Sequence, residues 1–334
     1  MSSPLLLVDD LEVHFRSRSL RRQRIVRAVN RIGFRIESGE TLALVGESGC
    51  GKSTTVRAVM RLLEPTGGRV LFQGTDITHL DRRAMRPIRR HMQVVFQDPY
   101  GSLNPRMTAR QIIAQPLRIH GEYGDSGPER VTELLGVVGL SREHADRFPH
   151  EFSGGQRQRV GIARALALSP RLVVLDEPVS SLDVSIRAQI LNLLRDLQDR
   201  LGVAFLLVSH DLSVVRHLSD RVAVMYLGRI VETAPRRDIF DRPHHPYTRA
   251  LLSAVPSPDP TLRSSRIVLK GEVPDPAHPP AGCGFWPRCF QAEDRCRTED
   301  PGLSMAPDEG HFCACHFPMV SPSLDPTTTS TGFR

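Results

Sequence analysis

The sequence predicts an α/β fold in which helices flank a mainly parallel sheet. From residue 1 to about residue 255, short apolar runs alternate with segments of helical periodicity. Two of the runs, residues 172–175 and 203–208, are continuously apolar, which is typical of strands buried on both faces. A third observation is the apolar strand at residues 41–45, which leads directly into a glycine-rich loop and a helix.

The strands and helices of this region follow from the same patterns. Helices are expected at residues 55–63, where Pro65 follows, and at residues 185–201, whose apolar side chains fall on one stripe. Between residues 98 and 168 the pattern is mostly helical, which indicates an inserted helical subdomain. Strands are expected at residues 5–15, 26–36, 41–46, 69–73, 92–96, 171–176, 203–209 and 221–231.

The composition changes near Pro256. The last 79 residues hold 13 of the 26 prolines and five of the six cysteines. We expect that such a segment cannot extend the sheet, because proline removes the backbone donor that a ladder needs. The predicted organisation is therefore an α/β domain at residues 1–255, a small cysteine-rich, loop-rich extension at residues 256–320, and a disordered tail at residues 321–334.

Bulk properties exclude several classes of protein. No apolar run approaches the ~20 residues of a membrane span, and the N-terminus lacks the basic region of a signal peptide. The net charge of +7 could suit nucleic acid, but only 5% of the residues are aromatic, which is low for stacking on single strands. We therefore expect a cytoplasmic protein that does not bind nucleic acid.

The strongest motif is the phosphate-binding pattern G-x-x-x-x-G-K-[ST]. Its backbone N–H groups and the following helix N-terminus can hold phosphate oxygens, with Lys52 on the β- and γ-phosphates and the Ser53 hydroxyl on Mg²⁺. Only Lys52 and Lys270 are lysines among 44 Lys and Arg residues, so the ammonium group is favoured over guanidinium at this position. The alternative is a chance glycine-rich turn. The nine residues of the motif are Gly46, Glu47, Ser48, Gly49, Cys50, Gly51, Lys52, Ser53 and Thr54.

Two adjacent acids end the apolar strand at residues 172–175. Asp176 is placed to hold Mg²⁺, and Glu177 can act as the general base for an attacking water. Taken alone, the pattern is also compatible with solvated acids after a strand.

A second anion-binding helix start is expected at Ser153. Ser153 is a suitable N-cap, and Gly154 and Gly155 leave the first amides of the helix bare before Gln156. An ordinary capped helix is the alternative.

Taken together, these motifs resemble those of ABC transporter ATPase subunits, in the same order along residues 1–255. By this resemblance, residues 153–156 are the signature motif, Gln97 is the Q-loop glutamine, Asp183 belongs to the D-loop, His210 is the switch histidine, and Phe15 is the candidate for stacking on adenine.

The resemblance implies a head-to-tail pair of ATPase domains. The residues of one subunit that would bind and hydrolyse ATP are Lys52, Ser53, Gln97, Asp176, Glu177 and His210, with Mg²⁺ held by Ser53, Gln97 and Asp176. Ser153, Gly154, Gly155 and Gln156 would complete the partner's ATP site. His210 would contact the γ-phosphate and hold the geometry between water and Glu177.

Two further segments, residues 97–106 and 244–252, resemble the ATPases of oligopeptide and dipeptide importers, a group that also includes nickel and glutathione importers. This implies a peripheral protein on the cytoplasmic face of the inner membrane. Its expected partners are a second ATPase chain or a copy of itself, two permeases and an extracytoplasmic substrate-binding protein. The alternative from another class is a soluble ABC ATPase acting on DNA or ribosomes, which often has two cassettes or a long coiled coil; this chain has one phosphate loop and no sustained heptads.

The cysteines of the extension carry a further expectation. No C-x2-C pair points to a structural zinc site, whereas four thiolates can hold a [4Fe–4S] cluster without compact spacing. The resemblance favours Cys283, Cys289, Cys296 and Cys315 as its ligands. Cys313 is the alternative fourth ligand, and free thiols are the alternative for the whole set.

Overall fold

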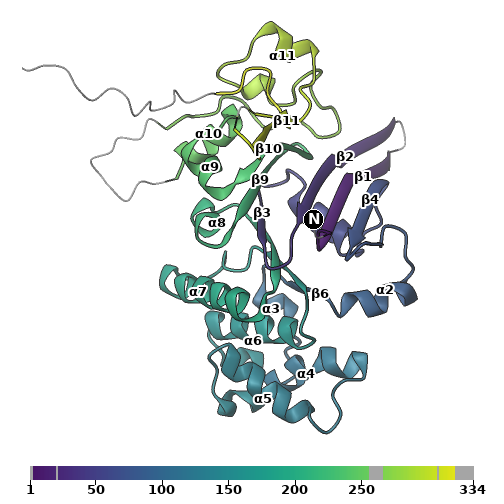
Figure 1. Ribbon diagram of the computed structural model, residues 1–334, viewed down its shortest axis with the longest axis vertical. Helices are drawn as coiled ribbons and strands as arrows, with labels where there is room; N and C mark the ends of the chain where they lie inside the picture. The colour runs from purple at the N-terminus through teal and green to yellow at the C-terminus, as the bar shows by residue number, and fades with distance from the viewer. Residues whose placement is uncertain (1–2, 20–21, 256–265, 307, 320–334) are drawn as a thin grey trace, which may run out of the picture.

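Two β-sheets and a set of helices make up the part of the chain that the computed structural model describes, residues 3–19, 22–255, 266–306 and 308–319 (Figure 1). The larger sheet has the strand order β11-β12-β10-β9-β3-β8-β7-β6. Strands β9, β3, β8, β7 and β6 are parallel. This arrangement confirms the predicted α/β class.

The centre of the larger sheet is buried on both faces. In β3 (Thr41–Val45), β7 (Leu172–Asp176) and β8 (Ala204–Ser209), alternate side chains belong to two different hydrophobic clusters. Phe205 and Leu207 face the first cluster, whereas Leu206 faces the second. The continuous apolar runs of the sequence arise from this two-sided burial.

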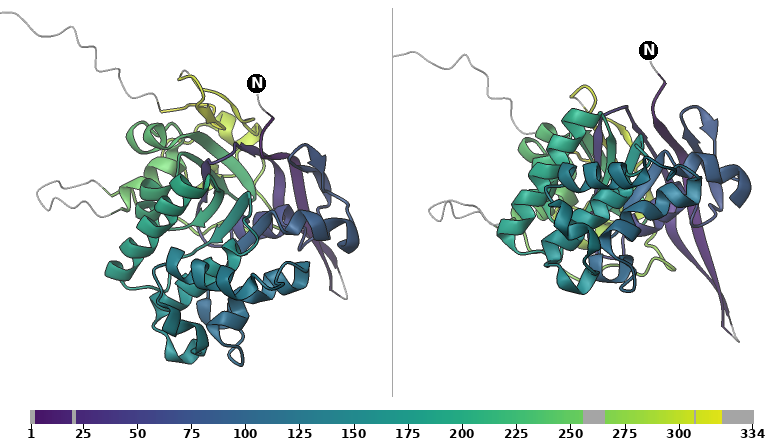
Figure 2. Two further views of the ribbon diagram at one scale, coloured as in Figure 1. Left: turned by 60° about the horizontal axis from the view of Figure 1, so that its bottom comes forward. Right: turned by 90° about the horizontal axis from the view of Figure 1, so that it is seen from below.

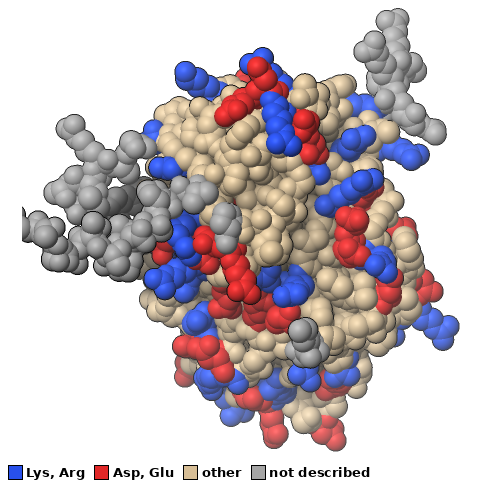
Figure 3. All heavy atoms as spheres, turned by 45° about the horizontal axis from the view of Figure 1, so that its top comes forward, with Lys and Arg blue, Asp and Glu red and all other residues tan. Residues whose placement is uncertain are grey.

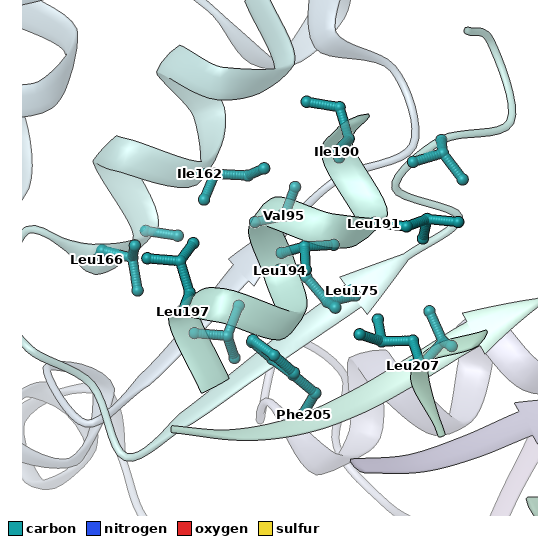
Figure 4. Packing of buried hydrophobic residues seen from close by; sticks show 14 of the residues in the cluster. Val95, Ile162, Leu166, Leu175, Ile190, Leu191, Leu194, Leu197, Phe205 and Leu207 are labelled. Carbon is teal, nitrogen blue, oxygen red and sulfur yellow. The ribbon is translucent and has the colours of Figure 1, made fainter. Parts of the chain in front are cut away.

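Helices α6 (Gly154–Leu166) and α7 (Val184–Leu201) cover one face of this sheet. Figure 4 shows Ile190, Leu194 and Leu197 of α7 directed between α6 and the strands. The helix ends at Gly202, whose φ of 63° gives a left-handed cap. The helix predicted at residues 185–201 is thus confirmed.

A second sheet covers the opposite face together with α1 (Lys52–Val59). It is antiparallel, with the order β2-β1-β4-β5. Its strands are β1 (Leu6–Ser19), β2 (Arg22–Ile36), β4 (Gly67–Phe72) and β5 (Thr75–Asp76). The first two are longer than the sequence predicts, and they extend away from the rest of the molecule as a hairpin (Figure 2). The helix expected at residues 55–63 spans Lys52–Val59 instead.

The prediction of one strand at residues 221–231 is wrong. The segment forms two antiparallel strands, β9 (Arg221–Tyr226) and β10 (Arg229–Pro235). Leu227 and Gly228 have φ values of 44° and 77°, which is the backbone of a two-residue hairpin turn. The apolar side chain of Leu227 conceals this turn in the sequence.

Between β6 (Met92–Val95) and β7 the chain is mostly helical and forms the lower part of Figure 1. Helix α2 (Arg82–Arg89) comes before β6. The elements after β6 are α3 (Pro99–Ser102), α4 (Ala109–His120), α5 (Gly127–Val137), η1 (Arg142–Asp146), η2 (Pro149–Glu151) and α6. Helices α4 and α5 pack on α6 through apolar side chains of the first hydrophobic cluster.

After β8, the chain forms α8 (Leu212–Leu218), α9 (Arg236–Asp241) and α10 (Pro246–Ser253). The described residues from 266 onward are mostly loops, with η3 (Trp286–Arg288), α11 (Asp294–Thr298), β11 (Ser304–Met305) and β12 (Phe312–Cys313). The tail predicted at residues 321–334 lies outside the described residues. No helix in the described ranges is long and apolar enough to cross a bilayer.

The expectation that the extension cannot extend the sheet is wrong. Strand β12 pairs with β10 through Glu232–Cys313 and Thr233–Phe312, and β11 pairs with β12. These residues are not prolines, so they keep the backbone donors that pairing requires. The extension is therefore joined to the edge of the larger sheet.

Candidate active site

Four loops that carry predicted site residues leave the same edge of the larger sheet. The loop of residues 46–54 follows β3, Gln97 follows β6, Glu177 follows β7 and His210 follows β8. These four strands are parallel, so their carboxyl ends meet at one edge. Ligands of open α/β sheets bind at this edge.

Glycine is required at two positions of the loop between β3 and α1. Gly46 has a φ of 153°, and a Cβ there would clash with the carbonyl oxygen of Met225. Gly51 has a φ of 110°, and a Cβ there would clash with the carbonyl oxygen of Ala28. At both positions, the positive φ angle and the clash of a Cβ with a carbonyl oxygen require glycine.

Lys52 is enclosed by its own loop. Its side chain is only 6% exposed, and its Nζ donates hydrogen bonds to the carbonyl oxygens of Gly46 at 2.7 Å and Glu47 at 2.9 Å. Ser53, next in the helix, is exposed and free to meet a ligand from solvent. Burial raises the pKa of the Cys50 thiol, although the nearby Lys52 ammonium opposes the shift.

The two acids after β7 differ in their surroundings. Burial and the neighbouring Glu177 raise the pKa of Asp176, against the opposing charges of Arg57 and Lys52. Glu177 has a φ of 49°, which is uncommon for a residue with a side chain. Backbone strain of this kind is concentrated at functional sites, where it places a side chain in one direction.

The carboxylate of Glu177 joins three of the predicted residues. Gln97 donates a hydrogen bond from Nε2 to Oε2 at 2.7 Å, and Nδ1 of His210 lies 2.9 Å from Oε1. The Glu177 side chain is 17% exposed, whereas that of His210 is 58% exposed. Glu177 is thus oriented from both sides, while His210 stays accessible to a ligand.

The start of α6 has the geometry expected of a capped helix. Gln156 donates its backbone N–H to Oγ of Ser153 at 3.3 Å, and Ser153 donates its own N–H to Oε1 of Gln156 at 3.0 Å. A Cβ on Gly155 would clash with Ile186 of α7, so the two helices approach closely here. The hydrogen bonds described for Ser153 and Gln156 join them to each other and do not reach Glu177.

Two other predicted residues lie at the surface. Phe15 lies on β1 opposite Val26 and is 44% exposed. Asp183 occupies the N-cap position of α7, makes no side-chain capping hydrogen bond, and is exposed. Both side chains are available for contact with a ligand or another subunit, and neither contacts the Glu177 cluster through a described hydrogen bond.

Four cysteines of the extension line one small cavity together with apolar and aromatic side chains. They are Cys283, Cys289, Cys296 and Cys315, whereas Cys313 lies on β12 opposite Glu232. Burial raises the pKa of Cys289 to about 11 and that of Cys315 to about 12. Cysteine thiolates are the usual ligands of iron–sulfur clusters, so four cysteines around one cavity are of the donor type that such a group uses.

Two contacts that sequence patterns do not reveal join the extension to the phosphate loop. Arg288 donates two parallel hydrogen bonds to the carboxylate of Glu47, at 2.7 Å and 3.0 Å. Glu47 also donates its backbone N–H to the hydroxyl of Tyr247 at 2.9 Å. Tyr247 belongs to a segment that the sequence singles out, but Arg288 lies among cysteines and has no motif of its own.

Comparison with known proteins decides the family. Residues 29–180 match the family model described as ABC transporter, and residues 231–296 match the model described as the C-terminal region of oligopeptide/dipeptide transporters. A probable peptide ABC transporter ATP-binding protein of Sinorhizobium fredii is 52% identical over 99% of this chain and 95% of its own length. The chain belongs to the ABC transporter family. The ATPase assignment made from the motifs is therefore confirmed.

Other relatives agree along nearly the full length. An oligopeptide transport ATP-binding protein of Bacillus subtilis is 50% identical over 93% of this chain and 97% of its own. Among solved structures, a dimeric ATP-binding cassette bound to ADP and Pi in a post-hydrolysis state aligns with a TM-score of 0.62 at 29% identity, covering 70% of this chain and 99% of that one. The cbiO1 protein of Clostridium perfringens, part of an ABC transporter complex, aligns equally well over 72% of this chain and 92% of its own.

Family membership fixes the coarse chemistry of this ABC ATPase. It binds ATP and Mg²⁺, hydrolyses ATP, pairs with a second ATPase domain, and associates peripherally with the permeases of a membrane transporter.

Proposed function

We propose that this ABC ATPase powers the import of peptides. The observation that carries the proposal is the agreement of relatives about 50% identical along nearly the whole chain, which are named for peptide or oligopeptide transport. The match of residues 231–296 to a region of oligopeptide/dipeptide transporters supports the same cargo. The subunit would work at the cytoplasmic face of the inner membrane with a second ATPase chain, two permeases and an extracytoplasmic substrate-binding protein.

In this proposal Lys52 binds the β- and γ-phosphates within the loop of residues 46–54. Ser53, Gln97 and Asp176 would hold Mg²⁺, which neutralises phosphate charge when bound. The raised pKa of Asp176 falls when a cation binds next to it, so the cation also fixes its charged form. Phe15, exposed on β1, is placed to stack on adenine.

Glu177 acts as the general base. Its strained backbone and its two side-chain partners, Gln97 and His210, direct the carboxylate to one place at the carboxyl edge of the sheet. The exposed His210 would contact the γ-phosphate and hold the geometry between the attacking water and Glu177. Gln97 would connect the site to the helical residues after β6. Ser153, Gly154, Gly155 and Gln156 serve the partner's ATP, with Asp183 at the contact between subunits.

The test of the base is Glu177→Gln in the assembled transporter. ATP binding is expected to persist while turnover falls about 10²–10⁴-fold, because the amide cannot accept a proton. The matched control is Glu309→Gln, an exposed acid of the extension, which should leave turnover unchanged. Turnover of the Glu177 variant at the parent rate would show that another group is the base.

The cargo is tested by stimulation of ATP hydrolysis. Membranes that contain the tagged chain are extracted, its copurifying permeases and binding protein are identified, and peptides, nickel and glutathione are added to the reconstituted complex in turn. Stimulation by peptides is expected. Stimulation by nickel or glutathione alone would show that one of these, and not peptides, is the cargo. Recovery of the chain with ribosomes or DNA would refute a role in transport.

On the face drawn in Figure 3, positive and negative side chains are interspersed, which does not favour binding of nucleic acid.

We also propose that the extension, residues 256–320, holds a [4Fe–4S] cluster on Cys283, Cys289, Cys296 and Cys315. The proposal is supported by the position of these four cysteines in the lining of one cavity, which Cys313 does not line. The cluster would connect loops that contain little regular structure. Anaerobic preparations of Cys315→Ser should lose most of their iron, while Cys313→Ser should retain it. Iron-free parent protein would refute the cluster.

A further inference from the structure

A wholly buried carboxylate lies where the extension meets the ATPase sheet. Glu232 of β10 is 0% exposed, and its Oε1 accepts hydrogen bonds from the His244 backbone at 2.6 Å and from Nε2 of His311 at 2.7 Å. Oε2 accepts one from the His245 backbone at 3.1 Å. A buried carboxyl group needs hydrogen-bond partners for its oxygen atoms, and these contacts supply them.

No arginine or lysine of the described residues forms an ion pair with Glu232; its ion-pair partner there is His311. Two histidine rings lie next to the carboxylate. His311 is 0% exposed and His244 is 2% exposed, and their ring centroids are 4.2 Å apart. The Nδ1 atom of each ring is buried and has no hydrogen-bond partner in the described part of the chain. An unsatisfied buried nitrogen atom is costly, and Nδ1 of His311, whose Nε2 is already bonded to Glu232, calls for a ligand that the protein itself does not provide. His244 instead faces Asp308 through Nε2.

Asp308 completes a set of three converging side chains. Its Oδ2 lies 3.2 Å from Nε2 of His244, and one ligand atom each from His244, Asp308 and His311 lie within 4.8 Å of one another. A tetrahedral metal with bonds of about 2.0–2.1 Å separates its ligands by roughly 3.3 Å. The separation between Nε2 of His244 and Oδ2 of Asp308 already matches this value. The two separations that involve His311 need only a small movement of the rings. The Asp308 side chain is 32% exposed, which leaves a route for a water ligand.

We propose that His244, Asp308 and His311 bind one divalent transition-metal ion of the zinc type. Two imidazoles, one carboxylate and a water make a four-coordinate set that suits zinc. Glu232 receives the Nε2–H of His311 and leaves Nδ1 to the metal, which is the usual carboxylate–histidine–metal arrangement. Arg242, 3.2 Å from Oδ1 of Asp308, holds that carboxylate from outside.

The ion would fasten the extension to the ATPase domain. His244 lies two residues before α10, whereas Asp308 and His311 lie in the loop that leads into β12. A metal shared by these segments fixes the loop next to β10. The site uses nitrogen and oxygen atoms, so it is chemically distinct from the four-cysteine cavity.

Cobalt(II) titration of the full chain tests the proposal. Nothing is added to or removed from the four-cysteine cavity after purification. The parent is expected to bind one Co²⁺ whose visible spectrum lacks sulfur-to-metal charge transfer. Asp308→Asn should weaken this binding about 10–100-fold or more, since even outer-shell losses have that effect. Arg242→Gln is the matched control, because it breaks the same ion pair and keeps all three ligands, so it should lose less affinity than Asp308→Asn.

X-ray absorption of the zinc-loaded parent tests the same site without any variant. Imidazole nitrogen and oxygen around zinc are expected. Zinc with sulfur ligands only, equal cobalt affinity in the parent and Asp308→Asn, or loss of affinity in Arg242→Gln to the same extent as in Asp308→Asn would each overturn the proposal. In those cases the cluster is a hydrogen-bond network around Glu232.

Discussion

The contact between Arg288 and Glu47 should make the phosphate loop depend on the extension. The Arg288 side chain is 8% exposed and that of Glu47 is 29% exposed, so solvent screens the pair only weakly. The guanidinium makes two hydrogen bonds, at 2.7 Å and 3.0 Å, and lies 5.9 Å from the ring centroid of Tyr226. Hydrogen bonds to charged groups contribute about 1.5–3 kcal/mol. We expect Arg288→Ala to lower the free energy of unfolding by about that amount.

The assay is a double-mutant cycle measured by denaturant unfolding without nucleotide. Arg288→Ala, Glu47→Gln and the double variant together give the coupling energy of the pair, which is expected at about 1.5–3 kcal/mol. Arg295→Ala is the matched control, since both it and its partner Glu299, the residue that follows α11, are exposed. That control should change stability little.

The same variant should also weaken ATP binding. Glu47 lies in the loop, so release of its side chain leaves the loop less ordered before ATP binds, and the KM for ATP should rise about 10-fold, which corresponds to about 1.4 kcal/mol. A coupling energy near zero, or an unchanged KM together with a large coupling energy, would refute the idea that Arg288 holds the loop.

Three substitutions test other parts of the site. Gly51→Ala should lower the free energy of unfolding by about 1–3 kcal/mol and abolish ATP binding, because φ is 110° and the Cβ would meet backbone. Calorimetry measures the first effect and nucleotide titration the second. A variant that binds ATP normally would contradict the loop geometry. His210→Ala should lower kcat about 100-fold with little change in KM, and a KM effect alone would contradict its position beside Glu177. Gly155→Ala should lower the melting temperature through its clash with Ile186, and an unchanged melting temperature would show that the helices can separate.

The sequence predicts which residues meet at the carboxyl edge of the sheet, because each motif is local. A strand, a glycine-rich loop and a helix must occur together to bind phosphate, so Lys52 is identified without knowledge of the rest of the fold. The parallel arrangement then brings Gln97 and His210 to Glu177, since all three follow the carboxyl ends of strands. In contrast, the split of residues 221–231 depends on the backbone angles at Leu227, which the apolar pattern does not reveal.

The extension is predicted poorly because its contacts are long-range. Arg288 and Glu47 are 241 residues apart, and Glu232 and His311 are 79 residues apart. Neither pair belongs to a spacing that sequence patterns detect. Prolines correctly indicate loops there, but they wrongly exclude β12, whose two residues keep their donors and pair with β10.

These long-range contacts make the extension part of the ATPase unit. Strand β12 lies on the sheet edge, Arg288 holds the side chain of Glu47, and Tyr247 accepts the backbone N–H of the same residue. Any group that orders the extension therefore also favours the ordered phosphate loop. Thermodynamic linkage makes this effect reciprocal, so ATP that orders the loop must favour the bound group by the same factor. A metal or cluster in the extension would thus influence ATP affinity without contacting the nucleotide.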